Sequence, residues 1–278
     1  MGSGIAQQVA QNGVTVLLLD VEIALAEKAK SKIGKTLTRL VESEKLMPAE
    51  AEATLARINP VSDYVSFSEA DLIIEAATER EEIKRKIFEA AGNMLRKDAI
   101  MATNTSSIPI TRMATSSPDP ERFIGLHFFN PVPVMGLIEV IPGLATSAKT
   151  LECTRAFAES LGKQVVQSED EPGFVVNRIL LPMINEAVFV LGQGTATVGD
   201  IDKGCRLGLN HPMGPLELAD FIGLDTCLDI VKVLYQSTGD SKYRAAPLLQ
   251  KYVDAGWLGR KTGRGFYDYT AGTSRPPR

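Results

Sequence analysis

Hydrophobic positions in the first part of the chain follow two spacings, one typical of helices and one of buried strands. Residues 5–10 carry apolar side chains at helical spacing, and Asn12-Gly13 then supplies a helix stop, because glycine adopts the left-handed conformation without strain. A continuous apolar run at 14–19 follows and ends at Asp20. This order of helix, glycine, buried strand and acidic residue predicts the second half of a dinucleotide-binding βαβ unit.

Helix and strand patterns continue to alternate up to about residue 168. A long helix of mixed polar and apolar residues is expected at 21–46. The predicted strands after it are 71–76, 99–104, 122–129, 136–143 and 163–168, with helices at 79–94 and 150–162. The strands read as continuous apolar runs, which is typical of strands covered on both faces. The pattern predicts the α/β class, with a Rossmann-type, doubly wound and mostly parallel sheet whose first strand is missing.

The pattern changes near 169–174, and from there onward it is helical. Helical spacing recurs at 175–194, 198–208, 215–236 and 246–256, and a strand is expected only at 266–269. Two domains are therefore expected: 1–168, of the Rossmann type, and 169–278, an all-α carboxyl-terminal domain. Residues 272–278 lack apolar side chains and are predicted to be disordered.

The first residues, Met-Gly-Ser-Gly, lead directly into a predicted helix. A dinucleotide-binding unit normally begins with a strand and a G-x-G-x-x-G loop. Gly2 takes the place of the third glycine, so the first strand and the first two glycines are expected to be missing. Such a loop supplies backbone N–H groups to a pyrophosphate, and such a strand covers the edges of its neighbours. Weak cofactor binding by this chain is therefore expected.

Composition excludes several classes of function. The 278 residues carry a formal net charge of −4, which gives no support for binding of nucleic acid or of an anionic membrane. No apolar run approaches the roughly 20 residues that a membrane helix needs. The three cysteines lack metal-ligand spacing and are predicted to be reduced, as in a cytoplasmic protein. With two histidines, a histidine-rich metal site is not expected.

Polar side chains follow three of the predicted strands. Asp20 can accept hydrogen bonds from the adenosine ribose and repel a 2′-phosphate, which favours NAD over NADP without excluding NADP. Glu79 and Lys84 follow the next strand, and Asn104 and Ser106 follow the one after it. Ligands of open parallel sheets lie outside the carboxyl ends of the strands. The alternative is that these residues only form turns and helix caps.

His127 lies inside an apolar segment, and Glu139 follows it 12 residues later on the next predicted strand. Asn130-Pro131 and further prolines between them predict a turn, so the two strands can bring His127 and Glu139 together. A buried carboxylate beside an imidazole selects the ring tautomer and stabilises the imidazolium, which suits a general base. A core histidine with an unrelated glutamate is the alternative, and the spacing does not decide between them.

Four segments resemble the 3-hydroxyacyl-CoA dehydrogenase family, in particular its short bacterial members that act as 3-hydroxybutyryl-CoA dehydrogenases. They are GLHFFNPVPVMGLIEVIPG, EPGFVVNRIL, HPMGPLELADFIGLDT and KTGRGFYDY. The resemblance runs from Gly2 to about Tyr269. It implies NAD-dependent oxidation of an L-3-hydroxyacyl-CoA, above all 3-hydroxybutyryl-CoA, or the reverse reaction, in fatty-acid metabolism through β-oxidation or in butanoate metabolism.

The resemblance also implies roles for individual residues. His127 would be the general base with Glu139 as its partner, while Ser106 and Asn177 would hydrogen-bond the substrate. The implied contacts to NAD are made by Gly2, Asp20, Glu79, Lys84 and Asn104. No metal is implied. The coenzyme A moiety of the acyl-CoA substrate is expected against the helix at 22–46 and in the cleft between the domains, and a homodimer is expected to form through the helical domain.

Two other functions remain open at this stage. A sugar-acid dehydrogenase of the lambda-crystallin type shares parts of these segments and would act on L-gulonate. A chain without its first strand can also keep the helical dimer and fail to hold the cofactor. Activity on acetoacetyl-CoA separates the first alternative from the dehydrogenase interpretation, and binding of NAD separates the second.

Overall fold

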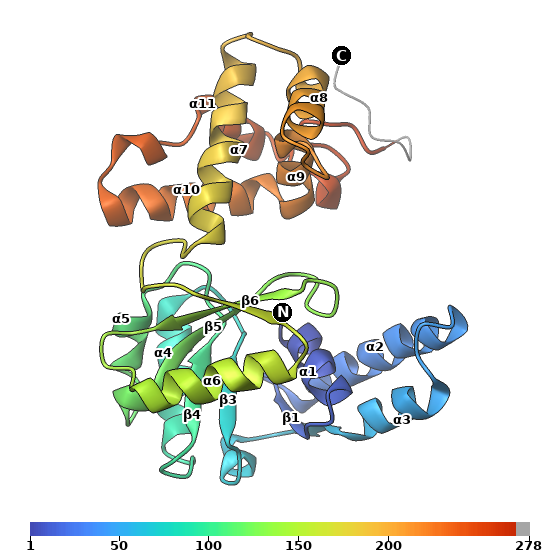
Figure 1. Cartoon of the computed structure of the whole chain (residues 1–278), viewed down its shortest axis with the longest axis vertical. Coiled ribbons are helices and arrows are strands. Elements are labelled where there is room, and N and C mark those ends of the chain that lie inside the picture. Colours follow the sequence, from blue (N-terminus) through green and yellow to red (C-terminus); the bar gives the residue numbers. More distant parts are fainter. Residues whose placement is uncertain (271–278) are drawn as a thin grey trace. The chain divides into compact units, whose positions relative to one another are not determined.

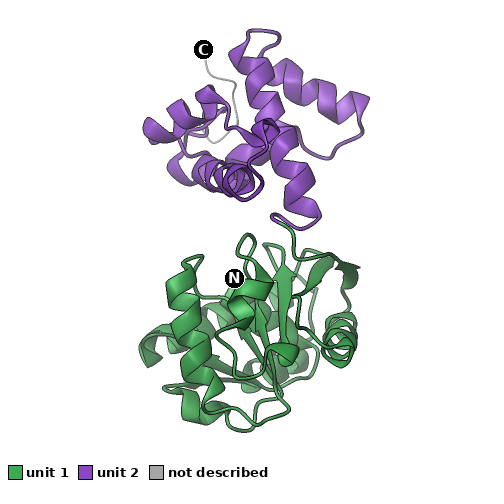
Figure 2. Cartoon of the chain, turned by 90° about the vertical axis from the view of Figure 1, so that its left-hand side faces the viewer, with its two compact units in different colours: residues 1–171 green, residues 172–278 purple. Residues whose placement is uncertain are grey.

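The computed structural model describes residues 1–270, which form two compact units (Figure 2). The first unit comprises residues 1–171 and combines helices with a sheet, whereas the second unit begins at Pro172 and is helical. The predicted class, a Rossmann-type α/β sheet followed by a helical part, is confirmed. The prediction for residues 272–278 lies outside the described residues.

The strands of the first unit form two sheets (Figure 1). The smaller sheet is a parallel pair, β1 (Val16–Leu19) with β2 (Ile58–Val61). The larger sheet has the order β3-β4-β5-β6-β7, and its strands are β3 (Leu72–Glu75), β4 (Ile100–Thr103), β5 (Phe123–Phe128), β6 (Leu137–Pro142) and β7 (Gln164–Gln167). All of its neighbours are parallel except β5 and β6, so the sheet is mostly parallel as predicted.

Helix α1 (Gly2–Gln11) packs against the cores of both sheets. Ile5 and Val9 lie in the core of the larger sheet, whereas Ala6 and Ala10 face the core around β2. The helix ends where Asn12-Gly13 predicts, with Gly13 at a φ of 87°. One short helix therefore joins the two sheets through two adjacent faces.

No backbone ladder joins β1 to β3 in the described part of the chain. In a doubly wound sheet with the order 3-2-1-4-5-6, the first strand lies between the second and the fourth. The strands β1 and β3 correspond to the second and the fourth, so the sheet is interrupted at the position of its central strand. Each of the two strands keeps one edge without a ladder partner.

The region between β1 and β3 differs from the expected single helix at 21–46. Helix α2 (Ile23–Glu42) ends earlier, and a second helix, α3 (Pro48–Ala56), precedes β2. Pro60 lies inside β2 and hides the strand pattern, because proline cannot donate a ladder hydrogen bond. The strand tolerates it because β2 is the outer strand of its sheet. The expected helix is thus present but shorter, whereas α3 and β2 were not predicted.

Helices cover the larger sheet on both faces. Side chains of α6 (Ala148–Ser160) share one apolar core with α1 and with Ile124 and Leu126 of β5. The opposite face is covered by α4 (Glu81–Gly92) and α5 (Ile110–Ala114). There Phe88 packs edge to face against Phe123, and Ile110 lies over Gly125. Alternate residues of β5 therefore face α6 on one side, and α4 and α5 on the other.

The second unit consists of helices around one apolar core. They are α7 (Val176–Gly192), α8 (Val198–Gly208), α9 (Pro215–Ile222), α10 (Leu224–Thr238) and α11 (Pro247–Asp254). The helical stretch predicted at 215–236 is broken at Gly223, whose φ of 107° favours glycine. The expectation of a strand at 266–269 is wrong. Within the described residues, Arg264 forms isolated bridges with Gly259 and with Asp268, and no strand is formed there. The side chains of this segment pack instead, with Phe266 fully buried.

Two buried aspartates fasten the last described segment to the helices. Asp202 accepts hydrogen bonds from Leu216 N, Glu217 N and the Tyr267 hydroxyl group. Asp220 accepts from Phe266 N, Tyr267 N and the Tyr269 hydroxyl group. Burial raises the pKa of Asp220, although these three donors act in the opposite direction. The two carboxylates thereby connect α8 and α9 to residues 266–269.

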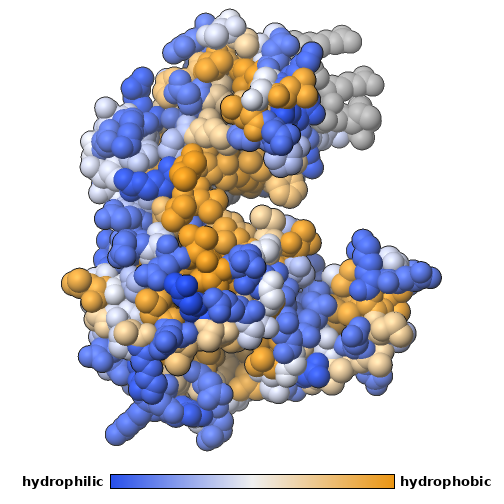
Figure 3. All heavy atoms as spheres, in the orientation of Figure 1, coloured by the Kyte–Doolittle hydropathy of each residue, from blue (hydrophilic) through white to orange (hydrophobic). Residues whose placement is uncertain are grey.

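No helix in residues 1–270 is long and apolar enough to cross a membrane. Figure 3 shows hydrophilic and hydrophobic residues side by side on the drawn face.

We predict that Gly265→Ala destabilises the second unit. A Cβ atom on Gly265 would fall on the carboxylate of Asp220. The carboxylate would then have to leave the backbone N–H groups of Phe266 and Tyr267. Overpacking of this kind costs about 1–3 kcal/mol, so the midpoint of thermal unfolding should fall. Circular dichroism at rising temperature measures it.

Gly204→Ala is the matched control. Gly204 lies in α8 and is exposed, and a Cβ atom there would meet nothing within 4 Å. Alanine favours a helix over glycine by up to about 1 kcal/mol, so the unfolding midpoint should stay or rise. Equal losses of stability in the two variants would contradict the role of Asp220.

Candidate active site

The antiparallel pairing of β5 with β6 sets His127 directly opposite Glu139. His127 Nδ1 lies 2.7 Å from Glu139 Oε2, and the two side chains are 8% and 0% exposed. The structure thus brings together two residues that the sequence only suggests as a pair. An ionised Glu139 accepts the Nδ1 proton, which leaves Nε2 of the ring with its lone pair. That nitrogen can take up a proton from a substrate.

The loop between these two strands is held by a buried lysine. Lys163 Nζ donates hydrogen bonds to Val132 O at 2.8 Å and to Met135 O at 2.9 Å. Burial lowers the pKa of Lys163. The two carbonyl groups replace part of the water that the ammonium group loses. Lys163 therefore ties β7 to the turn that follows His127.

Several polar side chains project from one face of the larger sheet. The register pairs Glu75 with Thr103, and Thr103 with Gly125 of β5. Because side chains alternate along a strand, His127 lies on the same face as Gly125. This is the face that α4 and α5 cover. The polar groups therefore gather on that face, towards the carboxyl ends of the parallel strands.

Glu79 holds the loop that follows β4. Its Oε1 accepts hydrogen bonds from Ser106 N at 2.6 Å and from Ser106 Oγ at 2.7 Å. Its Oε2 accepts from Thr105 Oγ1 at 2.9 Å. Glu79 and Ser106, which were predicted separately as cofactor and substrate contacts, are thus direct partners. The hydroxyl group of Ser106 donates to Glu79 and keeps its lone pairs for an incoming donor.

Lys84 is buried between two carboxylates. Its Nζ lies 2.6 Å from Glu75 Oε2 and 3.6 Å from Glu79 Oε2. The Lys84 side chain is only 2% exposed, so the ammonium group faces protein and reaches the site through Glu79. Sequence reasoning did not identify Glu75. Its only signal is an acid at the end of an otherwise apolar strand, where a buried charge requires a partner.

Asn104 connects the ends of β4 and β5. Its Oδ1 accepts a hydrogen bond from Phe128 N at 2.8 Å, one residue beyond His127. Its own backbone N–H donates to Glu75 O. These bonds fix the spacing between the strand that carries His127 and the loop that carries Ser106. Asn104 therefore bonds to backbone groups on both sides of the site.

Asp20 and Gly2 lie on the smaller sheet and on α1. Asp20 directly follows β1 and is exposed, and its Oδ1 accepts a hydrogen bond from Val21 N. Gly2 begins α1, whose first turn carries no acidic residue. The amide groups and the dipole of this end suit an anionic group such as a pyrophosphate. An exposed acid and a helix start without acidic residues therefore fit a dinucleotide.

Asn177, the remaining predicted substrate contact, belongs to the second unit. It lies in the first turn of α7, next to the start of that helix at Val176, and it is buried. The first unit alone therefore carries the histidine, its carboxylate partner and Ser106.

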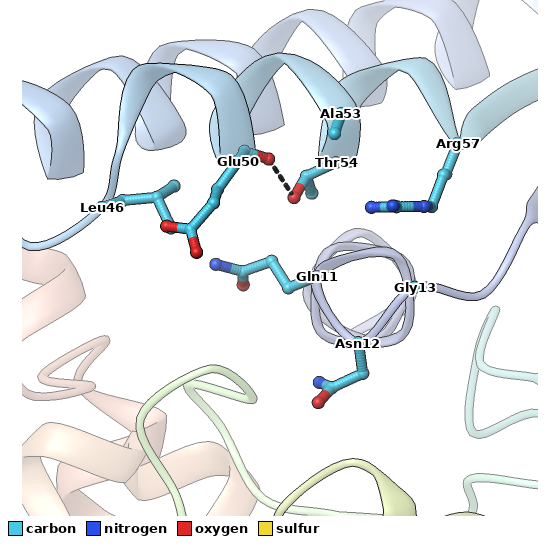
Figure 4. A pocket seen from close by; sticks show the side chains of 8 residues that line it. All are labelled: Gln11, Asn12, Gly13, Leu46, Glu50, Ala53, Thr54 and Arg57. Atoms are coloured by element: carbon cyan, nitrogen blue, oxygen red, sulfur yellow. Dashed lines mark hydrogen bonds between the residues drawn. The ribbon is translucent and has the colours of Figure 1, made fainter.

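A pocket of about 500 Å³ lies elsewhere in the first unit (Figure 4). Arg57 directly precedes β2 and Gly13 lies three residues before β1, so the pocket is at the amino ends of these strands, opposite to Asp20. Its lining residues are Gln11, Asn12, Gly13, Leu46, Glu50, Ala53, Thr54 and Arg57. None of the predicted site residues is among them.

Comparison with known proteins covers both units. Residues 1–171 match the family model for the NAD binding domain of 3-hydroxyacyl-CoA dehydrogenase. Residues 173–269 match the model for the carboxyl-terminal domain of the same family. A protein of Bradyrhizobium diazoefficiens named 3-hydroxybutyryl-CoA dehydrogenase is 52% identical over 279 residues, which cover 100% of this chain and 95% of that protein.

One solved structure and one further relative agree with the two family matches. The crystal structure of the (S)-3-hydroxybutyryl-CoA dehydrogenase PaaH1 from Ralstonia eutropha matches with a TM-score of 0.95 and 48% identity. The match covers 97% of this chain and 95% of that one. A mitochondrial hydroxyacyl-coenzyme A dehydrogenase of Sus scrofa is 39% identical over 97% of this chain and 88% of its own length.

We predict that Asp20→Asn weakens binding of NADH and reduces discrimination against NADPH. The substitution removes a charged acceptor for ribose hydroxyl groups and the repulsion of a 2′-phosphate. A hydrogen bond to a charged group contributes about 1.5–3 kcal/mol, so Kd for NADH should rise about tenfold or more. Titration of NADH fluorescence measures it.

The control is Asp71→Asn, at the opposite end of the strands. Asp71 directly precedes β3, and its side chain is highly exposed beside Arg96. Asp71→Asn also removes one negative charge, but far from the carboxyl ends of the strands, so Kd for NADH should not change. An unchanged ratio of NADH to NADPH affinity in Asp20→Asn would exclude Asp20 from the ribose site.

Proposed function

Because the chain belongs to the 3-hydroxyacyl-CoA dehydrogenase family, we propose that it interconverts L-3-hydroxybutyryl-CoA and acetoacetyl-CoA with NAD. The names of its relatives support the substrate and the NAD binding domain supports the cofactor. One observation carries the chemistry, the contact of 2.7 Å between His127 Nδ1 and Glu139 Oε2. L-3-hydroxybutyryl-CoA has a hydroxyl proton and a C3 hydrogen to lose, and this pair suits removal of the proton.

In the oxidation direction, His127 Nε2 takes the proton of the 3-hydroxyl group while the bond between C3 and its hydrogen breaks. A bound NAD would supply the acceptor for the hydride that leaves C3. The positive charge that forms on the imidazole ring lies beside the fully buried carboxylate of Glu139. A fixed opposite charge in a dry site stabilises this charge more than water does. In the reverse direction, the same nitrogen returns the proton.

Ser106 and Asn177 are proposed to hold the substrate. The Ser106 hydroxyl group donates to Glu79 in this structure, and with substrate bound it would turn that proton to the 3-oxygen, whose own proton goes to His127. Asn177 offers an amide group at the start of α7. Holding the reacting oxygen in one orientation makes the reaction of substrate with the imidazole effectively unimolecular. Ser106 would therefore contribute mainly by placing the 3-oxygen beside His127.

The cofactor contacts are proposed on the carboxyl edge of the strands. Asp20 would hold the adenosine ribose, and the start of α1 at Gly2 would face the pyrophosphate. Glu79, Lys84 and Asn104 would lie along the nicotinamide half, with Lys84 acting through Glu79. The short contacts among these side chains support a site that is formed before ligands bind.

We predict that His127→Gln lowers kcat for acetoacetyl-CoA-dependent oxidation of NADH by at least about 100-fold, because general acid–base catalysis contributes 100- to 10,000-fold. Glu139→Gln keeps the shape but removes the charge beside the ring, and it should lower kcat by about 10- to 100-fold. The absorbance of NADH follows both reactions.

His211→Gln and Glu152→Gln are the matched controls. His211 is the other histidine of the chain, and Glu152 is an exposed residue of α6. Both variants should retain the activity of the unaltered protein. Turnover of L-gulonate in place of acetoacetyl-CoA would instead identify a sugar-acid dehydrogenase. Failure to bind NADH at all would favour a chain that lacks a working cofactor site.

We further propose that the protein is a cytoplasmic homodimer that forms through the second unit. All three cysteines are free thiols, which supports a reducing compartment. Several large apolar side chains of the second unit are exposed, as expected of a surface that a second copy covers. They include Ile179, Leu207, Leu209 and Phe221.

We predict a mass near twice 30.1 kDa by light scattering. Leu207→Glu combined with Leu209→Glu should shift the protein towards the monomer, because a charge without a partner is costly in an apolar interface. Leu144→Glu changes an exposed leucine of the first unit and should leave the mass unchanged. A monomeric unaltered protein would contradict the proposed dimer.

A further inference from the structure

Glu75 is a buried acid that makes none of the proposed contacts with substrate or cofactor. It is the last residue of β3 and is 4% exposed. Its Oε1 accepts a hydrogen bond from Ala77 N at 2.7 Å. Its Oε2 accepts from Thr103 Oγ1 at 3.0 Å and from Lys84 Nζ at 2.6 Å. Both carboxylate oxygens are therefore occupied by donors of the protein itself.

Lys84 has two carboxylates within ion-pair distance, and they are not equivalent. Glu75 is the nearer one, at 2.6 Å, and its side chain is 1% exposed. Glu79 is at 3.6 Å, and its side chain is 46% exposed. Attraction increases as the separation and the dielectric constant fall, so Glu75 holds the ammonium group more strongly. This leaves the oxygens of Glu79 to Thr105 and Ser106.

Removal of the Glu75 charge would change which carboxylate binds the ammonium group of Lys84. A buried ammonium group that loses its partner is strongly destabilised. In the part of the chain that the structure describes, Glu79 is then the carboxylate left within 4 Å of Lys84. The ammonium group would move towards Glu79 and compete with Ser106 for the same carboxylate. The loop that carries Ser106 would lose the bonds that orient it.

We propose that Glu75 is a positioning residue for Ser106, acting through Lys84 and Glu79. By holding the ammonium group at the end of β3, it keeps Glu79 free to orient the amide and hydroxyl groups of Ser106. The placement of the loop follows from these contacts alone. Its effect on turnover rests on the proposed function, in which Ser106 holds the substrate.

Hydrogen–deuterium exchange tests the placement without any activity. In Glu75→Gln, amides in residues 104–109 should exchange about tenfold faster, because a lost bond of about 1.4 kcal/mol corresponds to tenfold in an opening equilibrium. Glu82→Gln is the control, since Glu82 is exposed in the first turn of α4. Unchanged exchange of 104–109 in folded Glu75→Gln would overturn the proposal.

A double variant, Glu75→Gln with Lys84→Met, separates positioning from general loss of structure. Replacement of both members of a buried ion pair is tolerated better than removal of one. Without the ammonium group, nothing competes for Glu79, so exchange at 104–109 should return to that of the unaltered protein. If Glu75→Gln alone does not fold, the double variant still tests whether the effect of Glu75 passes through Lys84. Fast exchange in the double variant would overturn the route through Lys84.

Kinetics test the consequence for turnover. A misplacement of 1 Å can cost about 100-fold, so kcat/KM for acetoacetyl-CoA in Glu75→Gln should fall about 10- to 100-fold. In a Ser106→Ala background the same substitution should change kcat/KM by no more than about twofold, because the effect passes through Ser106. Equal losses in both backgrounds would overturn the proposal. An unaltered protein inactive on acetoacetyl-CoA would contradict the proposed function, whereas hydrogen exchange would still decide the placement.

Discussion

The antiparallel pairing of β5 with β6 is the constraint on which the proposed catalytic pair depends. In a purely parallel sheet, neighbouring strands are joined by crossovers of a dozen or more residues with their own helices. Here a short loop returns the chain beside itself, so His127 and Glu139 are cross-strand partners although only 12 residues separate them. Both side chains are buried. The geometry of the pair therefore comes from backbone register, which loop motions alter little.

Charged side chains gather at the same face of the sheet, and all but Glu79 are buried. Two carboxylates, Glu75 and Glu79, share one ammonium group, and a third, Glu139, has the imidazole as a partner. Each charge is satisfied by a specific neighbour, as buried charges require. Polar groups arranged in advance do not have to reorganise when a reaction creates charge. The stability of the sheet and its suitability for catalysis thus depend on one set of contacts.

Much of this arrangement could be predicted from the sequence. Apolar runs that alternate with amphipathic helices predict the parallel sheet, and the loss of that alternation near 169–174 predicts a helical part. The strand β2 could not be found this way, because Pro60 interrupts the expected pattern in a strand of four residues. Its pairing with β1 depends on contacts that only the folded chain makes.

The candidate site was predictable in its residue types but not in its connections. His127 and Glu139 could be proposed from their spacing and from a resemblance, whereas their direct register required the folded sheet. The ends of two strands indicated Glu79 and Ser106 as separate ligand contacts, yet they are bonded to each other. Glu75 was not predicted as a site residue, because an acid that follows an apolar run is expected simply to mark the end of a strand. Burial of its carboxylate is a property of the tertiary structure.

The two aspartates of the second unit also affect how the protein is made. The donors that satisfy Asp220 come from residues 266–269, between 46 and 49 positions further along the chain. During synthesis, α9 with Asp220 is made before the residues that carry those donors. Until then the unit carries a carboxylate that has no partner to be buried with, and Phe266 is absent from its core. Burial of the Asp220 carboxylate therefore depends on residues 266–269, so completion of this core is coupled to the last described segment of the chain.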